Sequence, residues 1–269
     1  MTWHMLRVHT ERAADVSAAL FVAGALALQE EAGTVTTHFP TEADARDVAR
    51  RIALLDPDAE MEIGETPPAD YSGWRASVGA REVGGITVAP PWLATGLDPA
   101  RSVIIDPAMA FGTGEHATTR GALALLQRVL RPGETVVDLG TGSGVLAIAA
   151  AKLGADRVVG IEHDAEAIGN AQANVEANGV ADRVTVIQGD AGMLLPLLAP
   201  VRLVLANIAS LALLQLMPVI AAALTQDGQA VISGILSSES RGFRAHLREW
   251  SITEELVEDD WWTAAIALR

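Results

Sequence analysis

The second half of the chain alternates strand-like and helix-like segments, and this alternation constrains the fold more than any other feature. Five short apolar runs, the first four rich in β-branched residues, are predicted parallel strands: 135–139, 157–162, 183–188, 202–206 and 229–233. The segments between them are predicted helices, and residues 165–178 are the clearest because Gly179 can end a helix. The pattern predicts a doubly wound, Rossmann-like α/β domain whose ligand lies beyond the carboxyl ends of the strands.

The first 64 residues have a different organisation. Strands are predicted at 2–8, 26–31, 34–39 and 60–63. One helix would present Val16, Leu20 and Ala23 on a single face between the first two strands. A second helix would be capped by Thr41 together with Asp44, and Ala45, Val48, Ile52 and Leu55 would fall on one face of it. This order of elements predicts a small ferredoxin-like α+β domain.

A proline-rich stretch separates the two patterns. Residues 65–97 lose regular periodicity and contain Pro67, Pro68, Pro90 and Pro91, so they are predicted to form a linker with one strand at 86–89. The predicted division is therefore an N-terminal domain over 1–64, a linker over 65–97 and the α/β domain over 98–269.

The charge balance restricts the class of partner. The chain has 34 acidic and 19 basic residues among 269, which gives a formal net charge of −15. This surplus argues against direct DNA binding and against attachment to anionic lipid. A basic protein partner is compatible with it.

Several other classes are excluded by composition. The chain has no cysteine, so disulfides, thiolate catalysis and cysteine zinc sites are ruled out, and no metal site is predicted. The longest apolar candidate, 211–224, is interrupted by Gln215 and Pro218, which argues against a membrane span. Residues 16–28 have the length of a signal-peptide core, but Glu11 and Asp15 lie where such a peptide is basic, so a cytoplasmic location is expected.

The sharpest motif is a glycine-rich turn after the first predicted α/β strand. Asp138-Leu139 leads into Gly140, Gly142 and Gly144, and a helix is expected from Val145. Glycine allows positive φ and lets a ligand lie directly on the backbone, although an ordinary tight turn would have the same residues. Val145 stands where a dinucleotide fingerprint has glycine or alanine, which disfavours NAD. Asp138 can orient the turn and accept from a ligand ammonium, whereas it would repel a pyrophosphate.

Acidic residues close the next two strands. Glu162 follows Gly140 by 22 residues, where a carboxylate can accept both ribose hydroxyls. Asp190 follows the third strand and could reach an adenine amino group. These positions describe a nucleoside that carries an amino acid rather than a diphosphate. The predicted cofactor is S-adenosylmethionine, with S-adenosylhomocysteine as its product.

Two further segments would join this site. A loop rich in glycine and threonine, residues 106–119, leads into a helix expected at 120–130. Asn207 ends the fourth strand, either as a capping residue or as a carbonyl acceptor for a substrate amine. His116 by itself is more typical of a loop histidine than of a catalytic base.

At this point the chain resembles the ribosomal protein L11 methyltransferase family, a class I S-adenosylmethionine-dependent family. The resemblance is strong from about residue 90 to the C-terminus and covers residues 1–64 only in outline. The loop from Phe111 to Thr119 separates this family from other enzymes that use the same cofactor. The other residues that carry the resemblance are the turn 138–144, Asn207-Ile208, the strand end 233–236 and Trp261-Trp262.

The resemblance implies specific roles. It assigns cofactor contacts to Thr119, Gly140, Glu162 and Asn207, and Asn207 would also orient the substrate amine as the one residue with a catalytic role. The full set of predicted cofactor contacts is Phe111, Thr113, Thr118, Thr119, Asp138, Gly140, Gly142, Gly144, Glu162, Asp190 and Asn207. The chain departs from the family pattern at Glu162, where aspartate is common, and at Glu115 and Ala117, where proline is frequent.

The activity implied by the resemblance is methyl transfer to lysine and N-terminal amines of ribosomal protein L11. The N-terminal domain would hold the ribosomal protein, the linker would swing the catalytic domain among several amines, and a monomer is expected. A desolvated amine beside a sulfonium can lose its proton to water, so no dedicated base is required. Three alternatives remain open: another methyltransferase of this fold, an NAD-dependent oxidoreductase, and a non-catalytic S-adenosylmethionine-binding module.

Overall fold

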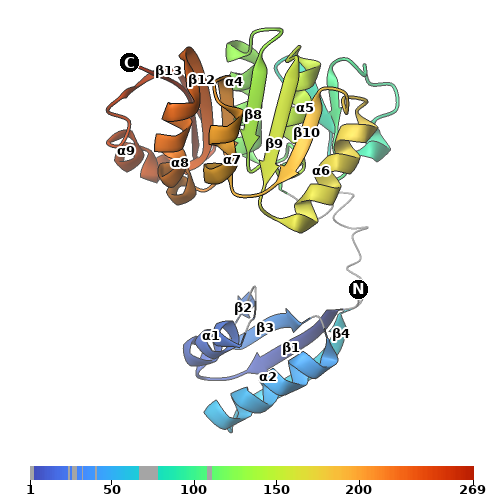
Figure 1. The fold of residues 1–269 in the computed structure, drawn as a ribbon. Helices are drawn as coiled ribbons and strands as arrows, with labels where there is room; N and C mark the ends of the chain where they lie inside the picture. The colour runs from blue at the N-terminus through green and yellow to red at the C-terminus, as the bar shows by residue number, and fades with distance from the viewer. Residues whose placement is uncertain are drawn as a thin grey trace. The chain divides into compact units, whose positions relative to one another are not determined.

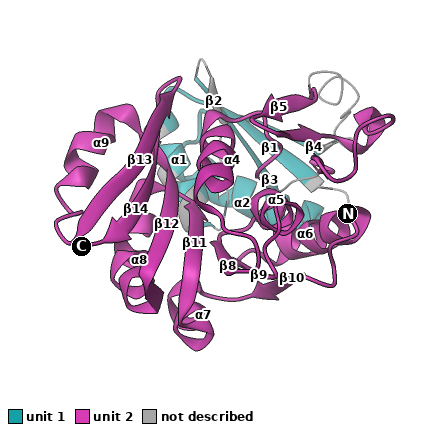
Figure 2. Cartoon of the chain, turned by 90° about the horizontal axis from the view of Figure 1, so that it is seen from above, with its two compact units in different colours: residues 1–77 teal, residues 78–269 magenta. Residues whose placement is uncertain are grey.

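The computed structural model of the chain describes residues 3–23, 25, 29–31, 33–39, 41–66, 78–107 and 111–269. These residues form two compact units, unit 1 over 1–77 and unit 2 over 78–269 (Figure 2). Each unit has its own hydrophobic core.

Unit 1 has the predicted ferredoxin-like order of elements. Its four strands form one antiparallel sheet in the order β2-β3-β1-β4. Two helices, α1 and α2, pack on this sheet (Figure 1). The elements are β1 Trp3–His9, α1 Ala13–Val22, β2 Gln29–Glu31, β3 Thr34–Phe39, α2 Glu42–Leu55 and β4 Glu60–Thr66. Of the strand predicted at 26–31, residues 26–28 lie outside the described residues.

The local signals in unit 1 explain its elements. The Thr41 hydroxyl accepts the Asp44 N–H at 3.1 Å and caps α2 as predicted. Ala45, Val48 and Ile52 are buried against the sheet, but Leu55 is 37% exposed. Leu55 is the last residue of α2, so no following turn of the helix covers it.

Unit 2 is built on a seven-stranded sheet in the order β10-β9-β8-β11-β12-β14-β13. The five strands predicted from the sequence, β8 to β12, pair in parallel, and the last two strands are antiparallel. The strands are β8 Thr135–Leu139, β9 Arg157–Glu162, β10 Val184–Gln188, β11 Val201–Asn207, β12 Leu224–Leu236, β13 Trp250–Glu258 and β14 Trp261–Leu268. The doubly wound α/β prediction is therefore confirmed.

Helices cover both faces of this sheet. On one face α4, α5 and α6 share a core with side chains such as Val136, and on the other α7, α8 and α9 share a core with Val137. Adjacent strand residues point to opposite faces, which is why both Val136 and Val137 of β8 are buried. The helices are α4 Ala117–Val129, α5 Val145–Lys152, α6 Ala165–Ala177, α7 Ala191–Leu198, α8 Ser210–Ala223 and α9 Ser237–Arg244.

The region predicted as a linker is partly structured. A small sheet joins β5 Arg81–Val83, β6 Ile86–Ala89 and β7 Ser102–Ile104, and a 3₁₀ turn spans Pro91–Leu93. Side chains of β5 and β6 are buried in the core of unit 2, so residues 78–97 belong to that unit rather than to a linker. The prolines there mark strand ends and a turn, while residues 67–77 lie outside the described residues.

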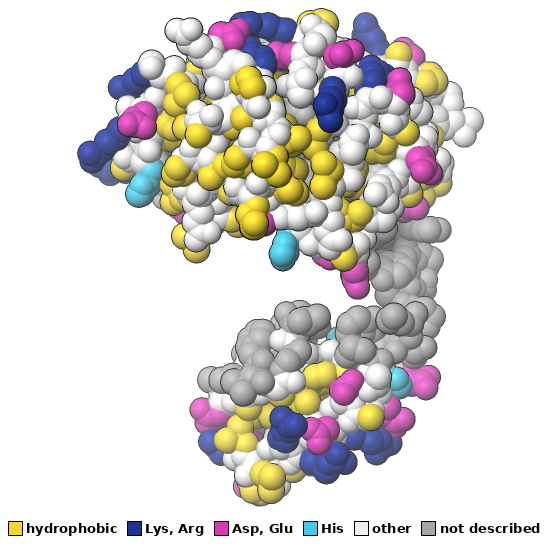
Figure 3. All heavy atoms as spheres, viewed as in Figure 1, with side chains coloured by type: hydrophobic (Ala, Val, Ile, Leu, Met, Phe, Trp, Pro, Cys, Tyr) yellow, Lys and Arg dark blue, Asp and Glu magenta, His cyan; other side chains and the backbone are white. Residues whose placement is uncertain are grey.

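The surface of unit 2 is unevenly composed. Figure 3 shows hydrophobic side chains gathered on the face of unit 2 turned to the viewer. Met193 and Leu197 of α7 and Leu211 of α8 are among its exposed large hydrophobic residues. Within the described part of the chain, no helix is long and apolar enough to cross a membrane.

Candidate functional site

The glycine turn after β8 needs glycine for both conformation and space. Gly140 and Gly142 have φ of 68° and 54°, in the left-handed region. A Cβ on Gly142 would lie 2.6 Å from the Phe111 carbonyl oxygen, and one on Gly140 would lie 2.6 Å from Ile208 Cγ2. The turn is therefore packed between the loop that starts at Phe111 and the end of β11.

Asp138 supports this turn from behind. It is 1% exposed, and its carboxylate accepts the Thr141 hydroxyl at 2.7 Å. Burial is the main cause that raises the pKa of Asp138 to about 7. Hydrogen bonds from the Thr141 hydroxyl and the Ala147 N–H lower this pKa, and the negative charge of Glu162 raises it. Asp138 thus serves the predicted role of orienting the turn, and its side chain is directed into the protein.

Glu162 fixes the backbone around the turn. One carboxylate oxygen accepts the Gly142 N–H at 2.9 Å, and the other accepts the N–H groups of His163 and Asp164 at 2.8 and 3.0 Å. Asp164 in turn caps α6 by accepting the Glu166 N–H at 2.9 Å. A carboxylate oxygen has two lone pairs, so Glu162 keeps capacity to accept from a ligand as well.

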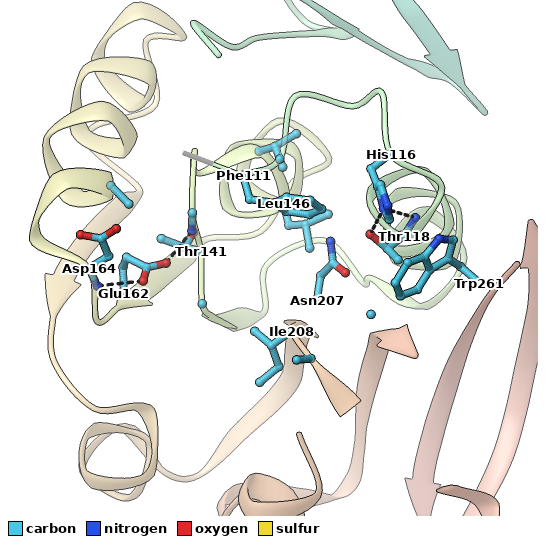
Figure 4. A pocket seen from close by; sticks show the side chains of 17 residues that line it. Phe111, His116, Thr118, Thr141, Leu146, Glu162, Asp164, Asn207, Ile208 and Trp261 are labelled. Carbon is cyan, nitrogen blue, oxygen red and sulfur yellow. Dashed lines mark hydrogen bonds between the residues drawn. The ribbon is translucent and has the colours of Figure 1, made fainter. Parts of the chain in front are cut away.

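The turn opens into a cavity of about 620 Å³ (Figure 4). Glu162, Asp164 and Thr141 lie at one end, called here the Glu162 end. His116, Thr118 and Trp261 lie at the other, called the His116 end, and Asn207 lies between them. The remaining lining residues are Phe111, Gly112, Gly140, Gly142, Val145, Leu146, Ala167, Ile208, Ala209 and Gly234.

A second cavity adjoins the first. It has a volume of about 290 Å³ and shares Gly140, Glu162 and Ile208 with the larger one. Asp190, which also caps α7, lines it together with Gln215. The Glu162 end therefore continues toward the end of β10.

The loop from Phe111 to His116 docks on the glycine turn. Ser143 donates its N–H to the Phe111 carbonyl at 2.9 Å and its hydroxyl to the Gly112 carbonyl at 2.8 Å.

Asn207 donates from Nδ2 to the Thr119 hydroxyl at 3.4 Å. Among the described contacts this leaves the Asn207 carbonyl oxygen free to accept a hydrogen bond.

His116 is the centre of the other end of the cavity. Its ring centroid lies 5.3 Å from that of Phe111 and 4.9 Å from that of Trp261, both in edge-to-face orientation. Its Nδ1 lies 2.8 Å from the Thr118 hydroxyl. Burial lowers the pKa of His116, the charge of Arg120 lowers it further, and Asp259 opposes both. The imidazole is accordingly neutral at neutral pH.

Most of the predicted site residues lie together. The larger cavity is lined by Phe111, Thr118, Gly140, Gly142, Glu162 and Asn207, and the smaller one adds Asp190. Four others line neither cavity: Thr113 accepts from the Glu115 N–H, Thr119 from Asn207, Asp138 from Thr141, and Gly144 is the N-cap of α5.

The sequence-based prediction missed several lining residues. Thr141 and Ile208 are direct neighbours of predicted residues, and Leu146 and Asp164 lie two positions after Gly144 and Glu162, so their proximity to the predicted motifs was the available signal. Trp261 was noted only as part of a terminal strand, and no local pattern pointed from it to His116.

The residues present fit S-adenosylmethionine. The turn offers backbone close to a ligand, and Glu162 and Asp190 offer acceptors for ribose hydroxyls and for an adenine amino group. The carboxylates of Glu162, Asp164 and Asp190 disfavour a phosphate ligand at the same place.

The position of the cavity defines the class of protein. It lies at the carboxyl ends of β8 and β11, where the strand order reverses, as ligand sites in open α/β sheets do. Together with the glycine turn and the acidic end of β9, this is the arrangement of a Rossmann-like S-adenosylmethionine-dependent methyltransferase.

Comparison with known proteins gives the family. The model of the ribosomal protein L11 methyltransferase (PrmA) family matches residues 3–269, and the chain belongs to this family of S-adenosylmethionine-dependent protein methyltransferases. The resemblance predicted from the sequence is thus confirmed.

Individual relatives agree with this assignment. The chain is 31% identical to a ribosomal protein L11 methyltransferase of Thiobacillus denitrificans over the full length of both. It is 46% identical to one of Desulfitobacterium hafniense over 59% of this chain, which spans 50% of that relative. A crystal structure of ribosomal protein L11 methylase from Lactobacillus delbrueckii subsp. bulgaricus superposes with a TM-score of 0.64 at 29% identity, covering 71% of this chain and 99% of that one.

Proposed function

We propose that this chain transfers methyl groups from S-adenosylmethionine to lysine and N-terminal amines of ribosomal protein L11. The observation that carries the proposal is a single cavity with two chemically different ends. One end combines a glycine turn with Glu162, and the other combines His116 with Trp261, with the Asn207 amide between them. The names of the relatives above support the choice of substrate.

The Glu162 end would hold the cofactor. Glu162 would accept from the ribose hydroxyls, Asp190 from the adenine amino group, and Gly140 and Gly142 would bring backbone against the ligand. Thr113, Thr119, Asp138 and Gly144 would support this surface without lining the cavity. Phe111 and Thr118 line the cavity toward the His116 end, so their predicted contacts would be with the part of the cofactor nearest the acceptor amine. When bound, S-adenosylmethionine supplies an electrophilic methyl group on a sulfonium.

The His116 end would receive the acceptor amine. The free side-chain carbonyl oxygen of Asn207 can accept a hydrogen bond from an N–H of the amine. This hydrogen bond would orient the lone pair of the amine nitrogen into the cavity. The rings of Phe111, His116 and Trp261 would exclude water there, and desolvation lowers the pKa of a lysine from its ordinary value near 10.4. A neutral His116 adds no positive charge beside the amine, and bulk water can take the released proton.

The protein substrate would be held mainly by unit 1. Ribosomal proteins are generally basic, so the net charge of −15 favours the encounter. The described residues that line the two cavities all belong to unit 2, so the monomer expected from the sequence can form the site by itself. An enzyme that modifies a ribosomal protein would act in the cytoplasm, where ribosomes are found.

The proposal can be tested with labelled cofactor. The purified chain is incubated with methyl-labelled S-adenosylmethionine and a mixture of separated ribosomal proteins, and labelled bands are identified by mass spectrometry. Label on L11 alone, at lysine and N-terminal amines, is expected. Label on a different protein would replace the substrate, and cofactor binding without any labelled protein would favour a binding module.

A further inference from the structure

Arg120, in the first turn of α4, joins two segments that are far apart in the sequence. Its Nε donates to Glu258 at 2.6 Å and its Nη2 to Asp259 at 3.3 Å, across 138 and 139 positions. Its Nη1 donates to the backbone carbonyl of Glu115. The Arg120 side chain is only 20% exposed, while those of Glu258 and Asp259 are 40% and 73% exposed, so the guanidinium is largely buried beneath the two carboxylates.

One of the joined segments is the turn between β13 and β14. Asp259 in this turn has a φ of 51° and is the only non-glycine residue with positive φ in the described part of the chain. Aspartate tolerates this conformation at some cost, so an external contact helps to hold it. Two residues later, Trp261 packs on His116 at the cavity.

The other joined segment is the loop that carries His116. The Glu115 carboxylate accepts the Gly79 N–H at 2.9 Å and pairs with Arg81 at 2.7 Å, which anchors this loop to the start of unit 2. Deeper in the unit, the Ser233 hydroxyl donates to the Thr118 carbonyl at 3.0 Å and lies 2.8 Å from the Thr263 hydroxyl. Ser233 thus holds the start of α4 through a buried hydrogen bond. Arg120 holds the turn between β13 and β14 against the same part of α4.

We propose that Arg120 is a positioning residue for the acceptor amine, because its guanidinium fork sets the spacing of Trp261 and His116 at the His116 end of the cavity. The inference rests on the proposed function, since it assigns that end to the acceptor. Arg120 touches neither the cofactor nor the reacting atoms, and it acts through the two rings. The charge of Arg120 also disfavours imidazolium at His116, as noted above, and Asp259 has the opposite effect.

The test compares Arg120→Gln with a matched control on the same helix. Arg128 also joins α4 to β13, through Glu254 at 2.9 Å, but it is not among the residues that line the cavity. Arg120→Gln should lower kcat on L11 roughly ten- to a hundredfold, because small misplacements of site walls have effects of this size. Its calorimetric affinity for S-adenosylmethionine should stay within about twofold of wild type, and Arg128→Gln should change neither quantity.

Two further variants separate geometry from charge. Arg120→Lys keeps the charge but loses the fork, so it should retain the low pKa of His116 without recovering the full kcat. Glu258→Gln combined with Asp259→Asn removes the two carboxylates that pair with Arg120, so kcat should fall. The pKa of His116 should fall further, because the negative charge of Asp259 is lost. In Arg120→Gln the pKa of His116 should rise instead. The His116 resonance, assigned with His116→Gln, gives this pKa by NMR.

The inference would be overturned by wild-type kcat in both Arg120→Gln and the double variant, or by an equal loss in Arg128→Gln. It would also be overturned if, across these variants, kcat changed with the pKa of His116 and not with the loss of the contacts of the Arg120 guanidinium. A failure of the proposed function gives a different result, because wild-type protein would then leave L11 unlabelled. The double variant keeps the test available if Arg120→Gln does not fold.

Discussion

The two ends of the cavity are held in different ways. The Glu162 end is built within residues 138–166 and depends on hydrogen bonds between a carboxylate and backbone N–H groups. The His116 end brings together a loop near residue 116, the end of β11 and the turn after β13, joined by ring contacts and ion pairs. A backbone-held end suits one invariant cofactor. An end held by side chains can adjust to acceptor amines in different surroundings.

The largest expected effect concerns unit 1, which contributes no residue to either end of the cavity. Deleting residues 1–77 removes unit 1 and leaves both cavities intact. Turnover of dilute L11 should fall about a hundredfold or more, because the tethered substrate contacts that raise its local concentration are lost. Cofactor affinity should remain within about twofold, and methylation of a short lysine peptide should be unchanged. Undiminished turnover of L11 by the fragment would show that unit 1 is not the recognition element.

The next prediction tests the support behind the Glu162 end. Because burial raises the pKa of Asp138 from 3.8 to about 7, the folded state binds a proton that the unfolded state releases between these pH values. The free energy of unfolding should therefore decrease as the pH rises from about 4 to about 7, by an amount on the order of a few kcal/mol. Asp138→Asn should lack this component of the pH dependence.

Chemical denaturation across this pH range measures the effect. Asp182→Asn is a suitable control because the Asp182 side chain is 75% exposed, and it should keep the wild-type slope. If the free energy of unfolding had the same pH dependence in Asp138→Asn and in the wild type, Asp138 would not retain a proton in the folded state below about pH 7.

Glu162 itself should matter for binding. Glu162→Ala removes the charged acceptor for the ribose and should weaken S-adenosylmethionine binding by about 1.5 to 3 kcal/mol, roughly ten- to a hundredfold. Glu166→Ala removes the same charge from an exposed position in the first turn of α6 and should leave the affinity within about twofold. A calorimetric affinity of Glu162→Ala equal to that of Glu166→Ala would refute the ribose contact.

The smallest effect concerns long-range charge. Raising salt from about 50 to 500 mM shortens the Debye length from roughly 14 to 4 Å. With a net charge of −15 on the enzyme, kcat/KM for basic L11 should fall several-fold, while cofactor affinity should change far less because its contacts are enclosed hydrogen bonds. The same salt dependence for both quantities would mean that the charge does not steer the substrate.

Sequence reasoning predicted what depends on local pattern. The strand at 135–139 and the Thr41 cap appear as expected, because buried parallel strands and helix starts have strong local signals. The strand at 86–89 was predicted and is β6, but β5 was missed and residues 78–97 were assigned to a linker, because the burial of β5 and β6 depends on the rest of unit 2. β13 was not predicted, since its residues alternate weakly on a half-exposed edge of the sheet.

The same distinction applies to the site. Gly140, Glu162 and Asp190 each close a strand, so their meeting follows from a parallel sheet. Trp261 contacts His116, and Arg120 contacts Glu258, across more than a hundred positions, and no periodicity or spacing in the sequence indicates such a contact. The Glu162 end was therefore predictable, and most of the His116 end was not.

The most direct test of the division between the two ends is the calorimetric affinity of Trp261→Ala for S-adenosylmethionine, measured beside that of Glu162→Ala. Trp261 contributes to the His116 end only, so its removal should leave the cofactor dissociation constant within about twofold of wild type, while Glu162→Ala weakens it roughly ten- to a hundredfold. If Trp261→Ala weakened cofactor binding as much as Glu162→Ala, the cofactor would extend over the whole cavity, and the account of separate cofactor and acceptor ends would be contradicted.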